Sequence, residues 1–198
     1  MVASDVMTSE PHDSPLGGAR GRTRTAILEA AVALWARDFS ASVSDVADRA
    51  EVSRSTLHRY FPDRQSLIDA ALATALNCME EDVGAGVDER APAVRQLEHM
   101  IRALIDHSDR VIFLFSDPGR FADNPQWEDQ DDDGSLDPLV MAAQTAGDLD
   151  PQIPVSWIVA TMYSLVYIAA EAIDNQTMSR HEAQDAAVRT FFRGVGPG

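Results

Sequence analysis

The run from Ser53 to Arg59 reads SRSTLHR and places hydroxyls, an imidazole and two guanidiniums within two helical turns. Short polar side chains and arginine are the groups that reach base edges in the major groove, while donors around them bind phosphates. The run therefore predicts a helix that reads DNA. The residues expected to contact DNA are Arg22, Arg24, Ser42, Ser53, Arg54, Ser55, Thr56, His58, Arg59, Tyr60 and Arg64.

The segment 42–61 is predicted to form two short helices joined by a tight turn, as in a helix-turn-helix motif. Ser42 and Asp45 have the spacing of a capping box, and Ser53 is a suitable N-cap for the second helix. Pro62 ends that helix because its ring disfavours helical backbone in the residue before it. A longer amphipathic helix upstream closes a three-helix unit; its apolar stripe is Ile27, Ala30, Ala31, Leu34 and Trp35.

Two runs in this region, ILEAAVALWARD and SVSDVADRAEVSRSTLHRYFPDRQSLI, resemble the TetR family of bacterial transcriptional regulators. The resemblance covers about a quarter of the chain and is specific in its combination of positions. Glu51 stands where the family usually has a turn glycine, and His58 replaces the usual tyrosine. Arg64 replaces a lysine that contacts phosphate in the family, and it keeps the charge.

The resemblance implies an all-α fold, in which an N-terminal three-helix helix-turn-helix DNA-binding domain precedes a helical ligand-binding and dimerisation domain. The expected divisions are a disordered tail over 1–20, the DNA-binding domain over 21–65 and the effector-binding domain over 66–198. The implied function is a ligand-responsive transcriptional repressor, released from a double-stranded DNA operator by a small molecule. Glu51 and His58 keep an alternative open: a TetR-like ligand-binding or interaction module with weak or lost DNA binding.

Charge is divided unevenly along the chain, whose net charge is −16. Residues 20–64 hold eight arginines and six acids, whereas residues 65–198 hold eight arginines and 23 acids. A mildly basic DNA-reading unit on a strongly acidic body should bind DNA locally and limit non-specific binding. The single cysteine excludes an internal disulfide, and no signal peptide is recognisable at the N-terminus, so a cytoplasmic location is expected.

The segment 153–170 contains no charged residue over 18 positions. This length reaches the threshold for a membrane span, but a helix buried on two faces is favoured, and no membrane association is expected. Further helices are predicted over about 91–108, 136–145 and 180–193, with a buried helical turn over 111–115. By resemblance, the last two helices pair with those of a second copy in a homodimer. The expected interface residues are Ile158, Leu165, Ile168, Ala183, Ala187 and Phe191.

The resemblance also implies an effector pocket between the central helices, suited to an apolar or flat small molecule. Candidate lining residues are Met79, Met100, His107, Phe113, Phe115, Trp157, Met162 and Tyr163; the alternative is that they are ordinary core.

Enzymatic chemistry finds no support, because the sequence lacks metalloprotease, P-loop, nucleophile-elbow and dinucleotide-binding motifs. No cofactor and no metal site are predicted. One segment leaves an alternative open: DQDDDGSLD over 129–137 begins like a calcium loop, but Val140 replaces the bidentate glutamate at its twelfth position. It is either an acidic inter-helix loop or a weak cation site.

Overall fold

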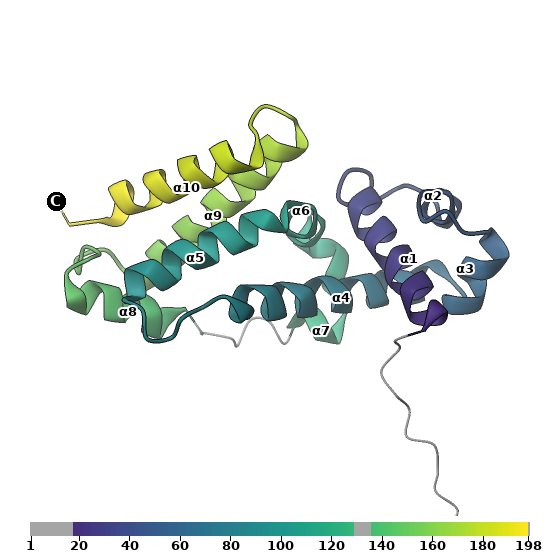
Figure 1. The fold of residues 1–198 in the computed structure, drawn as a ribbon, viewed down its shortest axis with the longest axis horizontal. Coiled ribbons are helices and arrows are strands. Elements are labelled where there is room, and N and C mark those ends of the chain that lie inside the picture. Colours follow the sequence, from purple (N-terminus) through teal and green to yellow (C-terminus); the bar gives the residue numbers. More distant parts are fainter. Residues whose placement is uncertain (1–17, 129–135, 198) are drawn as a thin grey trace, which may run out of the picture.

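The computed structural model describes residues 18–128 and 136–197, which are helical with no strand (Figure 1). The expected all-α fold is therefore confirmed. The N-terminal helices are α1 (Ala19–Trp35), α2 (Val43–Arg49) and α3 (Arg54–Tyr60), followed by the long α4 (Arg64–Ala85). The remaining elements are α5 (Ala93–Asp106), α6 (Ser108–Phe115), the 3₁₀ turn η1 (Pro118–Phe121), α7 (Pro125–Glu128), α8 (Asp137–Ala146), α9 (Val155–Asp174) and α10 (Arg180–Val195).

Three side-chain caps fix where α2, α3 and α4 begin, and those at α2 and α3 match the prediction. Ser42 and Asp45 form a reciprocal capping box at α2. The Ser53 hydroxyl accepts the Thr56 backbone N–H at α3, and Asp63 caps α4 in a second reciprocal box with Ser66. These caps satisfy backbone N–H groups that would otherwise lack partners, so local sequence sets the boundaries of the helix-turn-helix.

The head, defined as α1–α3, lies at one end of the molecule, with α2 and α3 outermost (Figure 1). Its core does not stop at residue 65, the expected domain boundary. We call the group of buried apolar side chains around α1–α3 the head cluster. It extends along α4 as far as Ala75, and it includes Phe113 and Leu114 from α6 and Phe121 from η1. Shared apolar packing therefore joins the head to the body, defined as α4–α10.

The body has its own core, built from α5, α6, α8, α9 and α10. α9 and α10 run antiparallel as a hairpin and pack on each other, while α9 also packs against α6 (Figure 1). Ile158, Met162 and Val166 form the buried side of α9. Among the described residues α9 is the one helix long and apolar enough to cross a membrane, a criterion that the core helices of soluble proteins also meet. Its inner side packs against α5, α6, α8 and α10, whereas its outer side is exposed.

The structure adds elements and boundaries that the sequence does not predict. Arg22 and Arg24 lie inside the first turns of α1, which begins at Ala19. The apolar run after Val111 belongs to a complete helix, α6, and the segments η1 and α7 have no counterpart among the predicted elements. The disordered tail predicted over 1–20 falls mostly outside the described residues, as does the acidic segment 129–135.

Candidate nucleic-acid interface and ligand cavity

The exposed side of α3 carries the predicted DNA-reading groups. Arg54, Ser55, His58 and Arg59 are all exposed, and their spacing places them on one face of the helix. Leu57 is fully buried in the head cluster and anchors the opposite face. The face displays two guanidiniums, an imidazole and a hydroxyl. The helix that carries it lies at one end of the molecule (Figure 1).

Some predicted contact residues also have structural roles. The Ser53 hydroxyl lies 3.0 Å from Ser55 Oγ and 2.9 Å from Thr56 Oγ1 while capping α3. At α2, the Ser42 hydroxyl and backbone N–H donate to Asp45 at 2.7 and 2.8 Å, and these bonds hold the pKa of that carboxyl below its usual value. Ser42 and Ser53 therefore have a structural role as the N-caps of α2 and α3. Arg24 lies over the Phe61 ring at 5.6 Å and Arg22 is exposed.

Glu51, in the turn between α2 and α3, has a φ of 55°, in the left-handed region. A glycine adopts this backbone without steric cost, whereas for a residue with a side chain it costs roughly 1–2 kcal/mol. The usual glycine at this position is thereby explained. The turn keeps its shape with glutamate, so the helix-turn-helix geometry survives this departure.

Arg64 has partners within the protein that its place in the family pattern does not indicate. Its guanidinium donates to the backbone carbonyls of Ala41 and Phe39 in the α1–α2 connection. It also lies over the Trp35 and Phe39 rings, at 4.8 and 5.4 Å from their centroids. Arg64 therefore supplies hydrogen-bond donors to two carbonyls of this short connection.

Arg64→Ala is accordingly expected to destabilise the head by about 2–3 kcal/mol, because it removes two charge-assisted hydrogen bonds and two cation–π contacts. Chemical denaturation followed by intrinsic tryptophan fluorescence would measure the change. Arg64→Lys should recover only part of the loss, since an ammonium cannot reach both carbonyls while lying flat on two rings. Full stability of Arg64→Ala would show that these contacts are dispensable.

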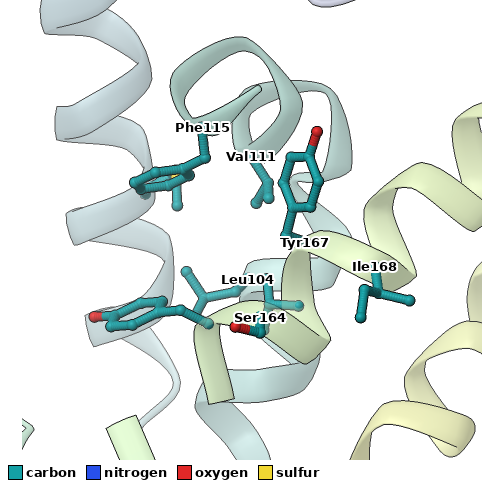
Figure 2. Close-up of a pocket in the computed structure, with 9 residues that line it drawn as sticks. Leu104, Val111, Phe115, Ser164, Tyr167 and Ile168 are labelled. Carbon is teal, nitrogen blue, oxygen red and sulfur yellow. The ribbon is translucent and has the colours of Figure 1, made fainter. Parts of the chain in front are cut away.

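A cavity of about 310 Å³ lies between α4, α5, α6 and α9. Figure 2 shows Phe115 and Val111 from α6 and Tyr167 and Ser164 from α9 arranged around the same space. The lining residues are Met79, Leu104, Val111, Phe115, Tyr163, Ser164, Val166, Tyr167 and Ile168. Three aromatic rings and a thioether give this space the character of a site for a flat apolar molecule.

Polar chemistry at the cavity is confined to hydroxyls. Tyr167 donates its phenolic O–H to Glu171 Oε1 at 3.3 Å, and burial and this carboxylate raise the pKa of the phenol. Ser164 Oγ donates to the Ala160 carbonyl at 2.8 Å. The lining itself has no charged residue, so a ligand would be oriented by hydroxyls and ring faces.

Three of the predicted pocket residues, Met79, Phe115 and Tyr163, line the cavity. The other predicted residues do not. Phe113 is buried in the head cluster, Met162 in the body core, and Met100 packs against that core. Trp157 is largely exposed, and His107 sits at the α5–α6 junction, where its Nδ1 lies 2.8 Å from Arg110 Nη1. The missed lining residues are Leu104, Val111, Ser164, Val166, Tyr167 and Ile168.

Most of the predicted dimer residues are buried inside the chain. Ile158, Ala183, Ala187 and Phe191 belong to the body core and cannot meet a partner, because they already pack within their own subunit. Leu165 is half-buried and packs against the same core. Only Ile168 is exposed as expected, at 58%. It belongs to a continuous exposed stripe, the outer face of α9, formed by Trp157, Ala160, Tyr163, Ser164 and Ile168.

The α1–α2 connection joins the head to the elements that line the cavity. Arg37 Nε donates to Asp174 at the end of α9 at 2.6 Å, and its Nη2 lies 3.8 Å from Asp109 of α6; the bond to Asp174 raises the Arg37 pKa. Arg120 lies over the Phe39 ring at 4.3 Å. Its buried Nε and Nη1 have no hydrogen-bond partner among the described residues, and burial lowers its pKa.

Metal chemistry has no candidate centre within residues 18–128 and 136–197, where no three His, Cys, Asp or Glu side chains gather. Of the acidic segment 129–137, the structure describes only the last two residues, Leu136 and Asp137. The cation alternative for that segment thus lies outside the described residues.

Comparison with known proteins accounts for this architecture. Residues 27–71 match the family model of bacterial regulatory proteins of the tetR family. The chain is 30% identical over 189 residues to the HTH-type transcriptional repressor LfrR of Mycolicibacterium smegmatis, covering 96% of this chain and 97% of the relative.

Solved structures give the same picture. The TetR-like regulator LfrR from Mycobacterium smegmatis in complex with proflavine is 28% identical, with a TM-score of 0.73 over 91% of this chain and 100% of that chain. The ketosteroid regulator KstR2 of Mycobacterium tuberculosis, 16% identical, shares the fold with a TM-score of 0.74 over 92% of this chain and 97% of that chain. This chain belongs to the TetR family of bacterial transcriptional regulators.

Proposed function

We propose that the protein is a ligand-responsive transcriptional repressor that acts in the cytoplasm, binds operator DNA as a homodimer and leaves it when a small molecule occupies the cavity. The observation that carries the proposal is the exposed face of α3, on which Arg54, Ser55, His58 and Arg59 project together. The proposed contact set is this face with Ser42, Ser53, Thr56 and Tyr60, and with Arg22 and Arg24 on the adjoining start of α1. Arg64 is left out of it because its guanidinium donates to two backbone carbonyls. We retain residues 21–65 and 66–198 as its functional divisions.

The route from cavity to DNA is short. α4 carries the cavity residue Met79 near its C-terminal end. At its N-terminal end it carries Arg64, which donates to the α1–α2 connection of the head. The Arg37 contacts reach α9 and α6, both of which line the cavity. A ligand that separates α4 from α6 and α9 would therefore alter how the head is held. The two heads of the dimer can have a spacing that fits the operator or one that does not. Repression is relieved if the ligand binds more tightly to the conformation that does not fit the operator.

The ligand class we favour is a flat, largely aromatic molecule. Phe115, Tyr163 and Tyr167 offer ring faces around an uncharged space. The acidic body, together with the proflavine complex of the relative LfrR, makes proflavine a suitable first probe. Binding would be followed by quenching or polarisation of the probe's own fluorescence.

Phe115→Ala and Tyr167→Ala are each expected to weaken probe binding by up to about tenfold, because a stacked aromatic contact is worth about 0.5–1.5 kcal/mol beyond its area. Met141→Ala is the matched control, since Met141 is another exposed apolar side chain but lies on α8 outside the cavity. Fluorescence titration gives the three affinities. An equal effect of all three substitutions would place the probe elsewhere.

The decisive test is binding of the full-length protein to DNA from upstream of its own gene, measured by fluorescence anisotropy at several salt concentrations. Specific binding in the range of about 10⁻⁸–10⁻¹¹ M is expected, far tighter than to a scrambled duplex of equal length. Addition of the ligand should release the DNA. If the protein binds the ligand but has no preference for any upstream sequence, the alternative of an interaction module without DNA binding is correct.

A further inference from the structure

Among the described residues, Arg120 of η1 is the one side chain with two buried donors that lack an acceptor. Its Nη2 donates to the Ser116 hydroxyl at 3.1 Å, whereas Nε and Nη1 are the two atoms without a partner. A buried donor without an acceptor raises the free energy of the state that contains it, and more so on a charged group. A second position of Arg120 that gives these donors an acceptor would recover that free energy.

Aromatic rings hold Arg120 in its present position. The guanidinium lies over the Phe39 ring at 4.3 Å and over the Phe121 ring at 5.9 Å. Phe39 belongs to the α1–α2 connection of the head, and Arg64 lies over the same ring at 5.4 Å. One guanidinium from α4 and one from η1 therefore contact a single ring of the connection. If Arg120 leaves this ring, the connection loses a contact that joins it to the body.

A carboxylate suited to the unpaired donors is held by Tyr167. The Tyr167 hydroxyl donates to Oε1 of Glu171, which is exposed and therefore able to turn. Burial lowers the pKa of Arg120 and raises the pKa of Tyr167, while the charge of each of these side chains acts in the opposite direction on the other. Tyr167 thus lies close to both Arg120 and Glu171. Its ring and its hydroxyl keep the guanidinium and the carboxylate apart.

Tyr167 is also part of the cavity wall. Figure 2 shows its ring beside Val111, with the hydroxyl at the end away from Leu104 and Ser164. The bond from this hydroxyl to Glu171 is 3.3 Å long, beyond the usual range of about 2.5–3.0 Å for O–H···O bonds, so it is weak. A ligand that stacks on the Tyr167 ring and moves it would break this bond and release the carboxylate.

We infer that Arg120 is a two-position latch: with the cavity empty it rests on Phe39 and holds the α1–α2 connection, and with the cavity occupied it turns to the carboxylate of Glu171. The inference rests on the proposed ligand cavity and names the residues through which its occupancy reaches the head. The first position keeps the ring contacts and leaves two donors unpaired, whereas the second pairs the donors and gives up the rings. A ligand shifts this balance by binding the second arrangement more tightly.

The first experiment needs no ligand. Tyr167→Phe removes the hydroxyl that holds Glu171 and keeps the ring. Hydrogen–deuterium exchange of the full-length protein, read by mass spectrometry, reports on the backbone amides of the connection, such as Ala41 N–H bonded to the Asp38 carbonyl at 3.1 Å. Exchange over 36–42 should be at least threefold faster in Tyr167→Phe than in the wild type. Adding Glu171→Gln should restore the wild-type rate, because glutamine carries no charge to attract Arg120. A merely structural role of the hydroxyl predicts no such rescue.

The second experiment uses proflavine at saturating concentration. In the wild type, it should speed exchange over 36–42 at least threefold, whereas in Glu171→Gln the rate should stay unchanged. Glu80→Gln is the matched control, since it removes the charge of another exposed glutamate on α4, and it should respond like the wild type. Neither glutamate lines the cavity, so fluorescence titration should give all three proteins the same proflavine affinity.

A Tyr167→Phe protein that exchanges like the wild type, or one that stays fast after Glu171→Gln is added, would overturn the latch whether or not proflavine binds. A Glu171→Gln protein whose connection still opens with proflavine would overturn it too. If Asp117→Asn blocks the opening instead, the acceptor is the other carboxylate near Arg120, and the assignment of Glu171 is wrong. If the exchange rates follow the latch but the wild type prefers no upstream sequence, the repressor proposal fails while the latch stands.

Discussion

Phe113→Ala is expected to lower the free energy of unfolding by about 3–5 kcal/mol, the range found for removing a fully buried phenylalanine. Phe113 belongs to α6 in the body, yet its ring is fully buried in the head cluster. It meets the edge of Phe121 at 5.3 Å, and Phe121 in turn meets Phe39 of the head connection at 6.4 Å. The substitution opens a cavity at the seam that holds the head on the body.

Urea denaturation followed separately by intrinsic tryptophan fluorescence and by far-UV circular dichroism would measure the loss. Phe115→Ala is the internal control, because it removes the same side chain two residues along α6 at a site that is 41% exposed. The control should cost far less. A Phe113→Ala protein as stable as the control would mean that the seam contributes little to the fold, and that the head is held mainly by the Arg37 bridges.

The head can be predicted closely from sequence because its signals are local. Capping boxes, an N-cap and a proline specify where α2 and α3 begin and end, and each acts within three or four residues. For Arg64, the position in the family pattern suggests a phosphate contact, whereas in the structure its guanidinium donates to two backbone carbonyls. Its real partners, the carbonyls of Phe39 and Ala41, lie 25 and 23 residues away. Only the folded chain shows that the short α1–α2 connection needs these donors.

The faces of the body helices are harder to predict, because apolar periodicity shows that a helix has buried sides without showing which neighbour covers each. On α9 almost every residue is apolar, so its pattern does not distinguish Ile158, which is fully buried, from Trp157, which is exposed. The cavity residues missed from α9 and α6 are ordinary valine, isoleucine, serine and tyrosine. Their part in the site comes from a gap between helices that depends on three-dimensional packing.

The largest functional effect is expected from removing both guanidiniums of the α3 face. If Arg54 and Arg59 each contribute about 1–3 kcal/mol to operator binding, the double substitution to alanine costs about 2–6 kcal/mol, a loss of affinity between about thirtyfold and more than ten-thousandfold. Both arginines are exposed: Arg59 lies over the Tyr60 ring at 5.8 Å, and Arg54 has only a minor charge interaction with Asp45. Thermal unfolding should therefore be close to that of the wild type.

The two single substitutions separate the reading of bases from the binding of phosphates. Loss of an arginine that reads a base relaxes the sequence preference at one operator position. Loss of an arginine that binds a phosphate weakens binding to all sequences alike and makes the salt dependence of the affinity shallower by about one unit. Arg95→Ala, which removes an exposed arginine of α5 far from the head, controls for net charge. Anisotropy titrations against the operator and a scrambled duplex give the affinity of each variant and its salt dependence. Operator affinity that survives the double substitution would remove α3 from the interface, because these two guanidiniums are the strongest donors that its exposed face displays.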